Sequence, residues 1–134
     1  MSKILIVCTS WYEDHLKKMI QISKTSFESE YDVQFLTAPG ALELAALAKN
    51  SLSKENFSGV LFLGIIMRGE TSHYDLVSQE TFRSIGNLAL EFPDKAVINN
   101  VICIENETQL VERIEKNTLN NCNCLLYTSP SPRD

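Results

Sequence analysis

The chain has 134 residues and a formal net charge of −5, and 44% of its residues are hydrophobic. This length fits one domain, and the apolar content supports a packed core and argues against disorder. The mildly acidic balance offers no basic surface for nucleic acid, and no apolar run approaches the roughly 20 residues that span a bilayer. A strand pattern begins at Lys3, so we expect no signal peptide, a cytoplasmic protein, and no nucleic-acid or membrane partner.

Apolar or alternating runs predict β-strands, in chain order, over residues 3–8, 31–37, 59–65 and 96–104. Helical spacing of apolar residues predicts helices over residues 13–27, 41–52 and 72–92, and from residue 106 onward. Ser72 with Asp75, and Asn106 with Gln109, have the spacing of helix-capping pairs. Strands alternating with helices predict an α/β fold: a flavodoxin-like three-layer α/β/α sandwich around a four-stranded parallel sheet.

The last segment, Cys124–Asp134, shows no helical period and contains two prolines. It resembles the in-frame translation of a sequencing adapter, and such additions are excluded from reasoning about a fold. We therefore expect a domain over residues 1–123 and a non-native tail over residues 124–134. The alternative is a genuine disordered tail rich in Ser and Pro.

The carboxyl ends of parallel strands meet at one edge of a sheet, which is where ligands bind in such folds. Trp11 follows the first strand, and it either stacks on a flat heteroaromatic ring or covers the edge of the sheet. Glu43 lies at the start of the second helix. Its carboxylate either accepts hydrogen bonds from ligand hydroxyls or is there because the helix dipole stabilises it.

The loop Arg68-Gly69-Glu70-Thr71 joins the third strand to the third helix. Its backbone N–H groups and the Thr71 hydroxyl suit an anion such as phosphate, although the loop is not a Walker motif. His73 follows at the helix start, where the dipole disfavours a charged imidazole, and it is a candidate for proton transfer. The alternative is a histidine that caps its own helix.

Two segments, Pro39–Glu43 and Gly64–Asp75, closely resemble the signature segments of the lumazine synthase family. Ile104–Arg113 is similar to the fourth-helix segment of that family, so the resemblance covers about residues 3–113. It implies a transferase of riboflavin biosynthesis that condenses 5-amino-6-(D-ribitylamino)uracil with 3,4-dihydroxy-2-butanone 4-phosphate. The products are 6,7-dimethyl-8-ribityllumazine, phosphate and water. No redox step occurs, so the resemblance implies no cofactor and no metal.

The resemblance also implies roles for individual residues. His73 matches the proton-transfer histidine, and Arg113 matches the arginine that binds phosphate. The other matched positions bind substrate: Trp11 stacks on the pyrimidine, Ala41, Leu42 and Glu43 bind the ribityl chain, Ile66 and Met67 contact the uracil edge, Glu70 and Thr71 form the phosphate loop, and Asn99 stands where many members place an aromatic pocket wall.

The family assembles as pentamers, or as shells of twelve pentamers, with each site shared between neighbouring subunits. We therefore expect a homopentamer or such a shell. Family members continue past the fourth helix with a lysine that contacts the ring and with a final helix, so we expect the 1–123 domain to be truncated. The competing function is a non-catalytic flavodoxin-like module that binds flavin or lumazine, or forms a shell. His73 and Arg113 favour the enzyme, because a pure binder needs neither a proton shuttle nor a cation that expels phosphate.

Overall fold

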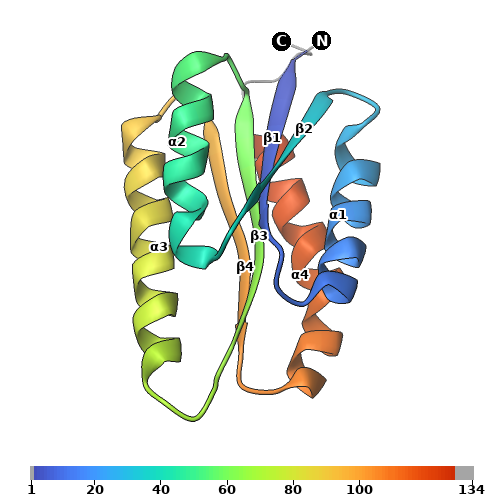
Figure 1. Ribbon diagram of the computed structural model, residues 1–134. Coiled ribbons are helices and arrows are strands. Elements are labelled where there is room, and N and C mark those ends of the chain that lie inside the picture. The colour runs from blue at the N-terminus through green and yellow to red at the C-terminus, as the bar shows by residue number, and fades with distance from the viewer. Residues whose placement is uncertain (1, 129–134) are drawn as a thin grey trace.

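A four-stranded parallel sheet forms the centre of the molecule, with the strand order β2-β1-β3-β4 (Figure 1). The structure is a computed structural model and describes residues 2–128. The strands are β1 (Lys3–Thr9), β2 (Asp32–Ala38), β3 (Gly59–Met67) and β4 (Ala96–Ile104). The helices are α1 (Glu13–Phe27), the 3-10 turn η1 (Ala41–Glu43), α2 (Leu44–Lys54), α3 (His73–Glu91) and α4 (Glu107–Thr128). The predicted three-layer α/β/α fold is confirmed.

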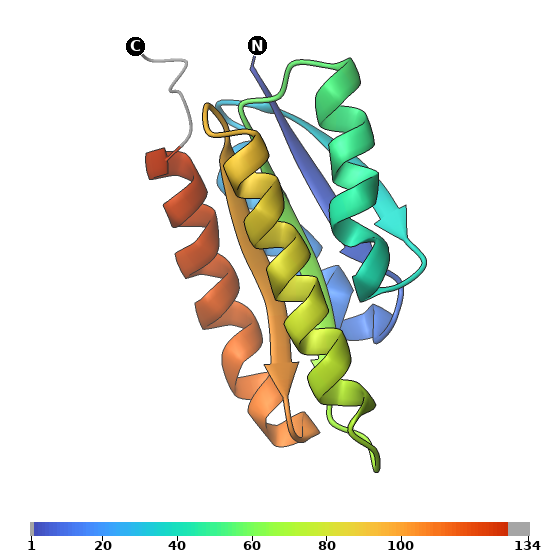
Figure 2. The same ribbon diagram turned by 90° about the vertical axis from the view of Figure 1, so that its left-hand side faces the viewer.

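Two apolar cores lie on opposite faces of the sheet, because successive side chains of a strand point to opposite sides. Ile4 and Ile6 of β1 pack with α1 and α4, whereas Leu5 and Val7 pack with α2 and α3. Figures 1 and 2 show the two helix pairs on either side of the sheet. The central strands β1 and β3 are buried on both faces, which explains their continuous apolar sequences.

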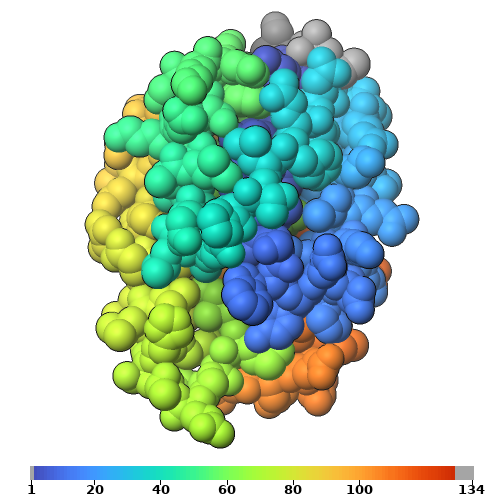
Figure 3. All heavy atoms as spheres, in the orientation of Figure 1, coloured from blue at the N-terminus to red at the C-terminus, as the bar shows by residue number. Residues whose placement is uncertain are grey.

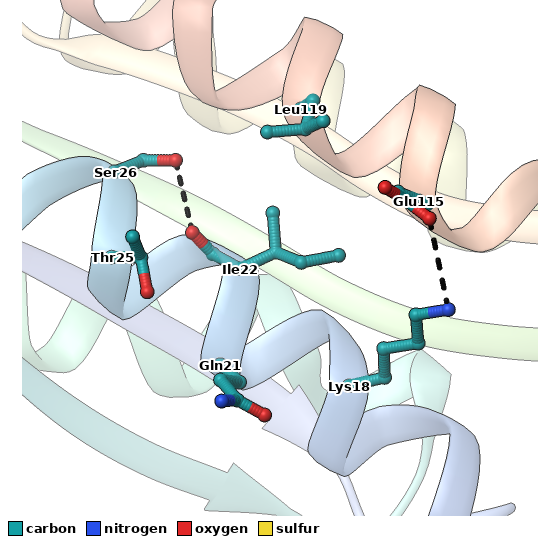
Figure 4. Close-up of a pocket in the computed structure, with 7 residues that line it drawn as sticks. All are labelled: Lys18, Gln21, Ile22, Thr25, Ser26, Glu115 and Leu119. Carbon is teal, nitrogen blue, oxygen red and sulfur yellow. Dashed lines mark hydrogen bonds and ion pairs between the residues drawn. The ribbon is translucent and has the colours of Figure 1, made fainter.

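The first and last helices, α1 and α4, pack against each other along one face. Their buried side chains include Ser23 of α1 and Cys122 of α4, whose Oγ and Sγ atoms are 3.7 Å apart. A shallow groove of about 330 Å³ follows the outer side of this contact, and Lys18 and Glu115 form an ion pair of 3.8 Å across it (Figure 4). No helix within residues 2–128 combines the length and the apolar character that crossing a bilayer requires.

The helix starts agree with the sequence patterns in one case and differ in another. At α4, the Asn106 side chain accepts a hydrogen bond from the Gln109 backbone N–H (3.0 Å), which confirms this cap. At α3, Ser72 makes no capping hydrogen bond, so the predicted Ser72–Asp75 capping pair is wrong. The physical reason is competition, because the Asp75 carboxylate is held by Arg68 at 2.9 Å.

The end of α4 differs from the prediction for the tail. α4 continues through Thr128, so residues 124–128 are helical and the expected lack of a helical period is wrong there. The reason is that Leu125 extends the buried stripe of α4 and packs into the core under β3. Residues 129–134, which include both prolines of the tail, lie outside the described residues. The domain boundary at residue 123 therefore stays a prediction.

Candidate active site

A cavity of about 280 Å³ lies at the carboxyl edge of the sheet, beyond the ends of β1 and β3. The turn after β1, the 3-10 turn η1 and the loop between β3 and α3 surround it, and these segments adjoin on the face of the molecule seen in Figure 3. The lining residues are Trp11, Tyr12, Ala41, Ile65, Ile66, Met67, Gly69, Thr71, His73, Tyr74 and Val77.

The β1 side of the cavity is formed by Trp11 and Tyr12. The indole Nε1 of Trp11 donates a hydrogen bond to the Pro39 carbonyl oxygen (3.2 Å), which ties this turn to the segment after β2. Trp11 is nevertheless 64% exposed, so a large part of its ring is available to a ligand. Tyr12 has φ 60° and ψ 52°, which lies in the left-handed region that residues other than glycine rarely adopt. Such backbone strain gathers at functional sites.

The segment η1 contributes Ala41 to the cavity and brings two further predicted residues beside it. Leu42 is half exposed and lies with His73 along a second groove of about 490 Å³ on the outer side of α3. The Glu43 carboxylate oxygens lie 3.7 and 3.8 Å from the position that a Cβ atom would take on Gly40. Glu43 has no side-chain hydrogen bond or ion pair within residues 2–128, so its carboxylate is free to accept hydrogen bonds from a ligand.

The β3–α3 loop places Thr71 and His73 at the mouth of the cavity. His73 is the first residue of α3, and its backbone N–H donates to the Thr71 hydroxyl oxygen (3.2 Å). Glu70 and Thr71 are exposed, as is Gly69, and a Cβ atom added to Gly69 would meet nothing within 4 Å. The loop is therefore exposed beside the imidazole and open at Gly69, and the N–H groups of a loop that leads into a helix N-terminus suit an anion.

Arg68 joins this loop to its surroundings through four contacts. Its backbone N–H donates to the Ile104 carbonyl oxygen at the end of β4 (2.9 Å). Its guanidinium contacts the Asp75 carboxylate through Nη2 (2.9 Å) and the Glu105 carboxylate through Nε (3.4 Å). The guanidinium carbon also lies 4.5 Å from the centre of the Tyr74 ring, in a cation–π arrangement.

Tyr74 and Cys103 form a less polar layer close to the loop. Burial is the main cause that raises the pKa of the Tyr74 hydroxyl, and it also raises the pKa of the Cys103 thiol. Both groups are therefore neutral at pH 7 and supply no charge to the cavity.

Asn99 and Arg113, two predicted substrate-binding residues, do not line this cavity. Asn99 lies in the middle of the edge strand β4, in register with Phe62, and its Oδ1 atom accepts a hydrogen bond from the Val101 backbone N–H (2.8 Å). Arg113 is exposed on α4 and makes no hydrogen bond or ion pair within the described residues. The structure thus separates the predicted site into a cavity and an outer β4–α4 edge.

A buried polar network fixes the outer edge in place. The Asn100 side chain is 2% exposed, and its Nδ2 atom donates to the Thr118 hydroxyl oxygen (2.9 Å). The Asn121 Nδ2 atom donates to the Asn100 Oδ1 atom (2.6 Å). Thr118 and Asn121 of α4 therefore hold the side chain of Asn100, the residue after Asn99. These hydrogen bonds fix the position of α4 against β4.

Sequence reasoning did not assign a role to Tyr12, Tyr74 or Val77, although all three line the cavity. The signal for Tyr74 and Val77 was their spacing of three residues at the start of the third helix, which places them on one face of that helix. The signal for Tyr12 was only its adjacency to Trp11. Within residues 2–128, no cluster of three His, Cys, Asp or Glu side chains is placed to hold a metal ion.

Comparison with known proteins identifies one family. The family described as 6,7-dimethyl-8-ribityllumazine synthase matches residues 1–123. A 6,7-dimethyl-8-ribityllumazine synthase of Novosphingobium aromaticivorans is 33% identical over 117 residues, which is 86% of this chain and 82% of the relative. One of Erythrobacter litoralis is 35% identical over 117 residues, covering 86% of this chain and 81% of the relative. One of Neisseria meningitidis is 35% identical over 88 residues, covering 66% and 55%.

Proposed function

This chain belongs to the 6,7-dimethyl-8-ribityllumazine synthase family, and we propose that its cavity is where lumazine is formed. The reaction is the condensation of 5-amino-6-(D-ribitylamino)uracil with 3,4-dihydroxy-2-butanone 4-phosphate in riboflavin biosynthesis. The protein is accordingly a transferase. One observation supports the assignment of this reaction to the cavity: both segments that resemble the family signatures contribute to its lining, the first through Ala41 and the second through residues that include Thr71 and His73.

The pyrimidine substrate fits the β1 and η1 side of the cavity in this proposal. Trp11 presents an exposed ring whose nitrogen is already anchored, so its face stacks on the pyrimidine without costly ordering. Ile66 and Met67, at the end of β3, contact the uracil edge. Ala41 and Leu42 flank the ribityl chain, and the unpaired Glu43 carboxylate accepts hydrogen bonds from its hydroxyl groups.

The phosphate substrate fits the loop at the start of α3. The Glu70 backbone N–H and the Thr71 hydroxyl belong to an exposed loop with open space at Gly69, and the N-terminus of a 19-residue helix adds partial positive charge. Arg113 completes the phosphate site as a guanidinium that binds two oxygens, which stabilises the departing phosphate. Because Arg113 lies outside the cavity of its own chain, we propose that it serves the site of a neighbouring subunit.

Proton transfer is the role of His73. The amine of the pyrimidine attacks the ketone to form an imine, phosphate leaves, the enol tautomerises, and the second amine closes the ring. These steps move protons to and from nitrogen and carbon, and a positioned imidazole accelerates such transfers by roughly 10²- to 10⁴-fold. Because the two substrates are reactive by themselves, holding the amine against the ketone contributes at least as much as proton transfer.

We propose a homopentamer, alone or as the unit of a larger shell, in which each site is shared between adjacent subunits. Asn99 and Arg113 support this assembly because they lie on the β4–α4 edge rather than at the cavity of their own chain. Exposed apolar side chains on α3 support it further, since large apolar groups open to water mark contact surfaces. They are Leu76, Phe82 and Leu90, which are 65%, 47% and 79% exposed.

We also propose that the enzyme works in the cytoplasm. All four cysteines, Cys8, Cys103, Cys122 and Cys124, are free thiols. Free thiols are typical of a reducing compartment, where disulfides are rare.

The test of the function is an absorbance assay for lumazine formation with both substrates. We expect the wild-type chain to form lumazine, and His73→Ala to retain measurable but reduced activity because proximity remains. Ligand binding without product formation by the wild type would contradict the enzyme and support the competing function, a non-catalytic flavin- or lumazine-binding module.

A further inference from the structure

We propose that Arg68 is a positioning residue for the phosphate loop, acting through Asp75 and not by contact with the phosphate. This inference rests on the proposed function, because it names how one part of that site keeps its shape. Arg68 is the first residue of the loop and Asp75 follows the loop in α3, and their ion pair of 2.9 Å joins the two ends of the loop.

The loop has few other contacts that could hold it. Gly69 has nothing near the position of a side chain, and Glu70 makes no side-chain interaction within residues 2–128. The internal hydrogen bond from the His73 N–H to the Thr71 hydroxyl (3.2 Å) connects neighbours only and does not anchor the loop to the sheet. The anchors are the Arg68 backbone bond to Ile104 and the Arg68 side chain.

The guanidinium is poorly suited to bind phosphate directly. It is shared between the carboxylates of Asp75 and Glu105 and stacks on Tyr74. One cation between two carboxylates leaves an excess of negative charge, which repels a phosphate rather than attracting it. A planar guanidinium can contact two carboxylates and an aromatic ring at the same time, which the single ammonium group of lysine cannot do.

A positioning role for Arg68 and direct binding of phosphate by Arg68 predict opposite results for the variant Asp75→Asn. If Arg68 only positions the loop, then Arg68→Ala and Asp75→Asn remove the same clamp and weaken phosphate binding alike. If Arg68 binds the phosphate itself, Asp75→Asn frees the guanidinium and leaves phosphate binding intact or improves it. The two variants therefore separate the mechanisms.

The experiment measures steady-state kinetics for Arg68→Ala, Asp75→Asn and the double variant. We expect each single variant to raise KM for the butanone phosphate about tenfold, because a misplaced binding loop loses its contacts. The double variant should equal either single variant, since one clamp is broken in all three. KM for the pyrimidine should stay within about twofold, because that substrate occupies the other side of the cavity.

Glu105→Gln is the matched control, because Glu105 contacts the same guanidinium from outside the loop at 3.4 Å. We expect its KM values to stay within about twofold of wild type, because Glu105→Gln leaves the contact between Arg68 and Asp75 across the loop in place. An unchanged KM for the butanone phosphate in Asp75→Asn, or additive effects in the double variant, would overturn the inference.

A second measurement does not depend on the reaction. The ¹⁵N relaxation order parameters of the Gly69–Thr71 amides should fall below about 0.6 in Arg68→Ala and Asp75→Asn, but not in Glu105→Gln. If the wild-type chain forms no lumazine while this pattern is seen, the proposed function fails and the positioning role stands. If the order parameters are unchanged in both clamp variants, the positioning role is wrong even in an active enzyme.

Discussion

The two halves of the proposed site differ in how the chain builds them. The cavity half is made by loops that follow the central strands β1 and β3, and it brings Trp11, Ala41, Thr71 and His73 to one place within a single chain. The outer half lies on the edge strand β4 and on α4, and Arg113 there has no partner within residues 2–128. The loops that follow the central strands β1 and β3 bring their residues together at one cavity. The edge strand β4 has a neighbouring strand on one side only, so its other side is open to contact with another molecule.

This difference explains why the site needs an assembly in our proposal. A closed ring of identical subunits lets the edge of one chain complete the cavity of the next, and repeated use of one interface leaves no half-site unfilled. In this proposal, neither half of the site is sufficient for the reaction without the other half. Each half can therefore be impaired separately by substitution.

The outer half depends on α4 remaining seated on the sheet, and Leu125 is the buried anchor near its end. Leu125 is fully buried, so Leu125→Ala should lower the free energy of unfolding by about 3 kcal/mol through lost burial and a residual cavity. Chemical denaturation measures the change. Leu126→Ala is the matched control because Leu126 is only partly buried, and a loss as large as that of Leu125→Ala would contradict the assigned packing.

Arg113 tests the chemistry of the outer half. Arg113→Ala should raise KM for the butanone phosphate by about 10- to 150-fold, the loss expected for a charge-assisted contact worth about 1.5–3 kcal/mol. The melting temperature should not change, because the side chain is exposed. An unaltered KM for the phosphate substrate would show that the role of Arg113 is wrong.

Mixing two impaired variants tests whether the site is shared. His73→Ala and Arg113→Ala subunits, unfolded together and reassembled in equal amounts, should regain activity because about a quarter of their shared sites contain both intact residues. Each variant refolded alone is the control. Activity of the mixture that equals the average of the two controls would place both residues in one chain's site.

The cavity half is tested by Trp11. Trp11→Ala should weaken binding of the ribitylaminouracil by about 1–3 kcal/mol, which is typical of a lost aromatic stack. The fold should be unaffected because the side chain is 64% exposed on a turn. Trp11→Phe keeps a stacking ring but loses the hydrogen bond to Pro39, so it should retain more affinity than Trp11→Ala. Equal affinity of wild type and Trp11→Ala for the pyrimidine would contradict stacking.

The smallest expected effect concerns the strain at Tyr12 in the same turn. Asparagine tolerates the left-handed conformation better than tyrosine, so Tyr12→Asn should raise the free energy of unfolding by about 0.5–1 kcal/mol. Tyr12→Ala is the control, because it removes the ring but keeps the backbone strain. Thermal unfolding compares them, and a Tyr12→Asn variant no more stable than Tyr12→Ala would show that the strain is not relieved.

The elements of the fold could be read from the sequence because their signals are local. The apolar runs near Lys3 and Gly59 are continuous since both faces of β1 and β3 are buried. The capping of α3 could not be read locally, because Asp75 is taken by Arg68 across the loop. The end of α4 was misjudged from composition, although Leu125 continues the spacing of the buried residues before it.

The candidate site was predictable where short motifs follow strand ends. Motif residues such as Ala41, Thr71 and His73 meet at the cavity because parallel strands place their carboxyl ends together. The separation of Arg113 from that cavity was expected only through the family resemblance, since spacing along the chain does not reveal which side of an edge strand a helix occupies. The Arg68 clamp and the strain at Tyr12 depend on neighbours in space, which periodicity cannot report.

The packing of α1 against α4 also determines when each face of the sheet can be covered during synthesis of the chain. α1 (Glu13–Phe27) is made early, but α4 (Glu107–Thr128), which covers the same face of the sheet, is made last among the described elements. Translation proceeds at roughly 5–20 residues per second. The apolar residues of α1, which include Leu16, Met19 and Phe27, are therefore made on the order of ten seconds before the residues of α4 that cover them. The opposite face closes earlier with α2 and α3, so a chaperone that guards the nascent chain should bind the α1 face.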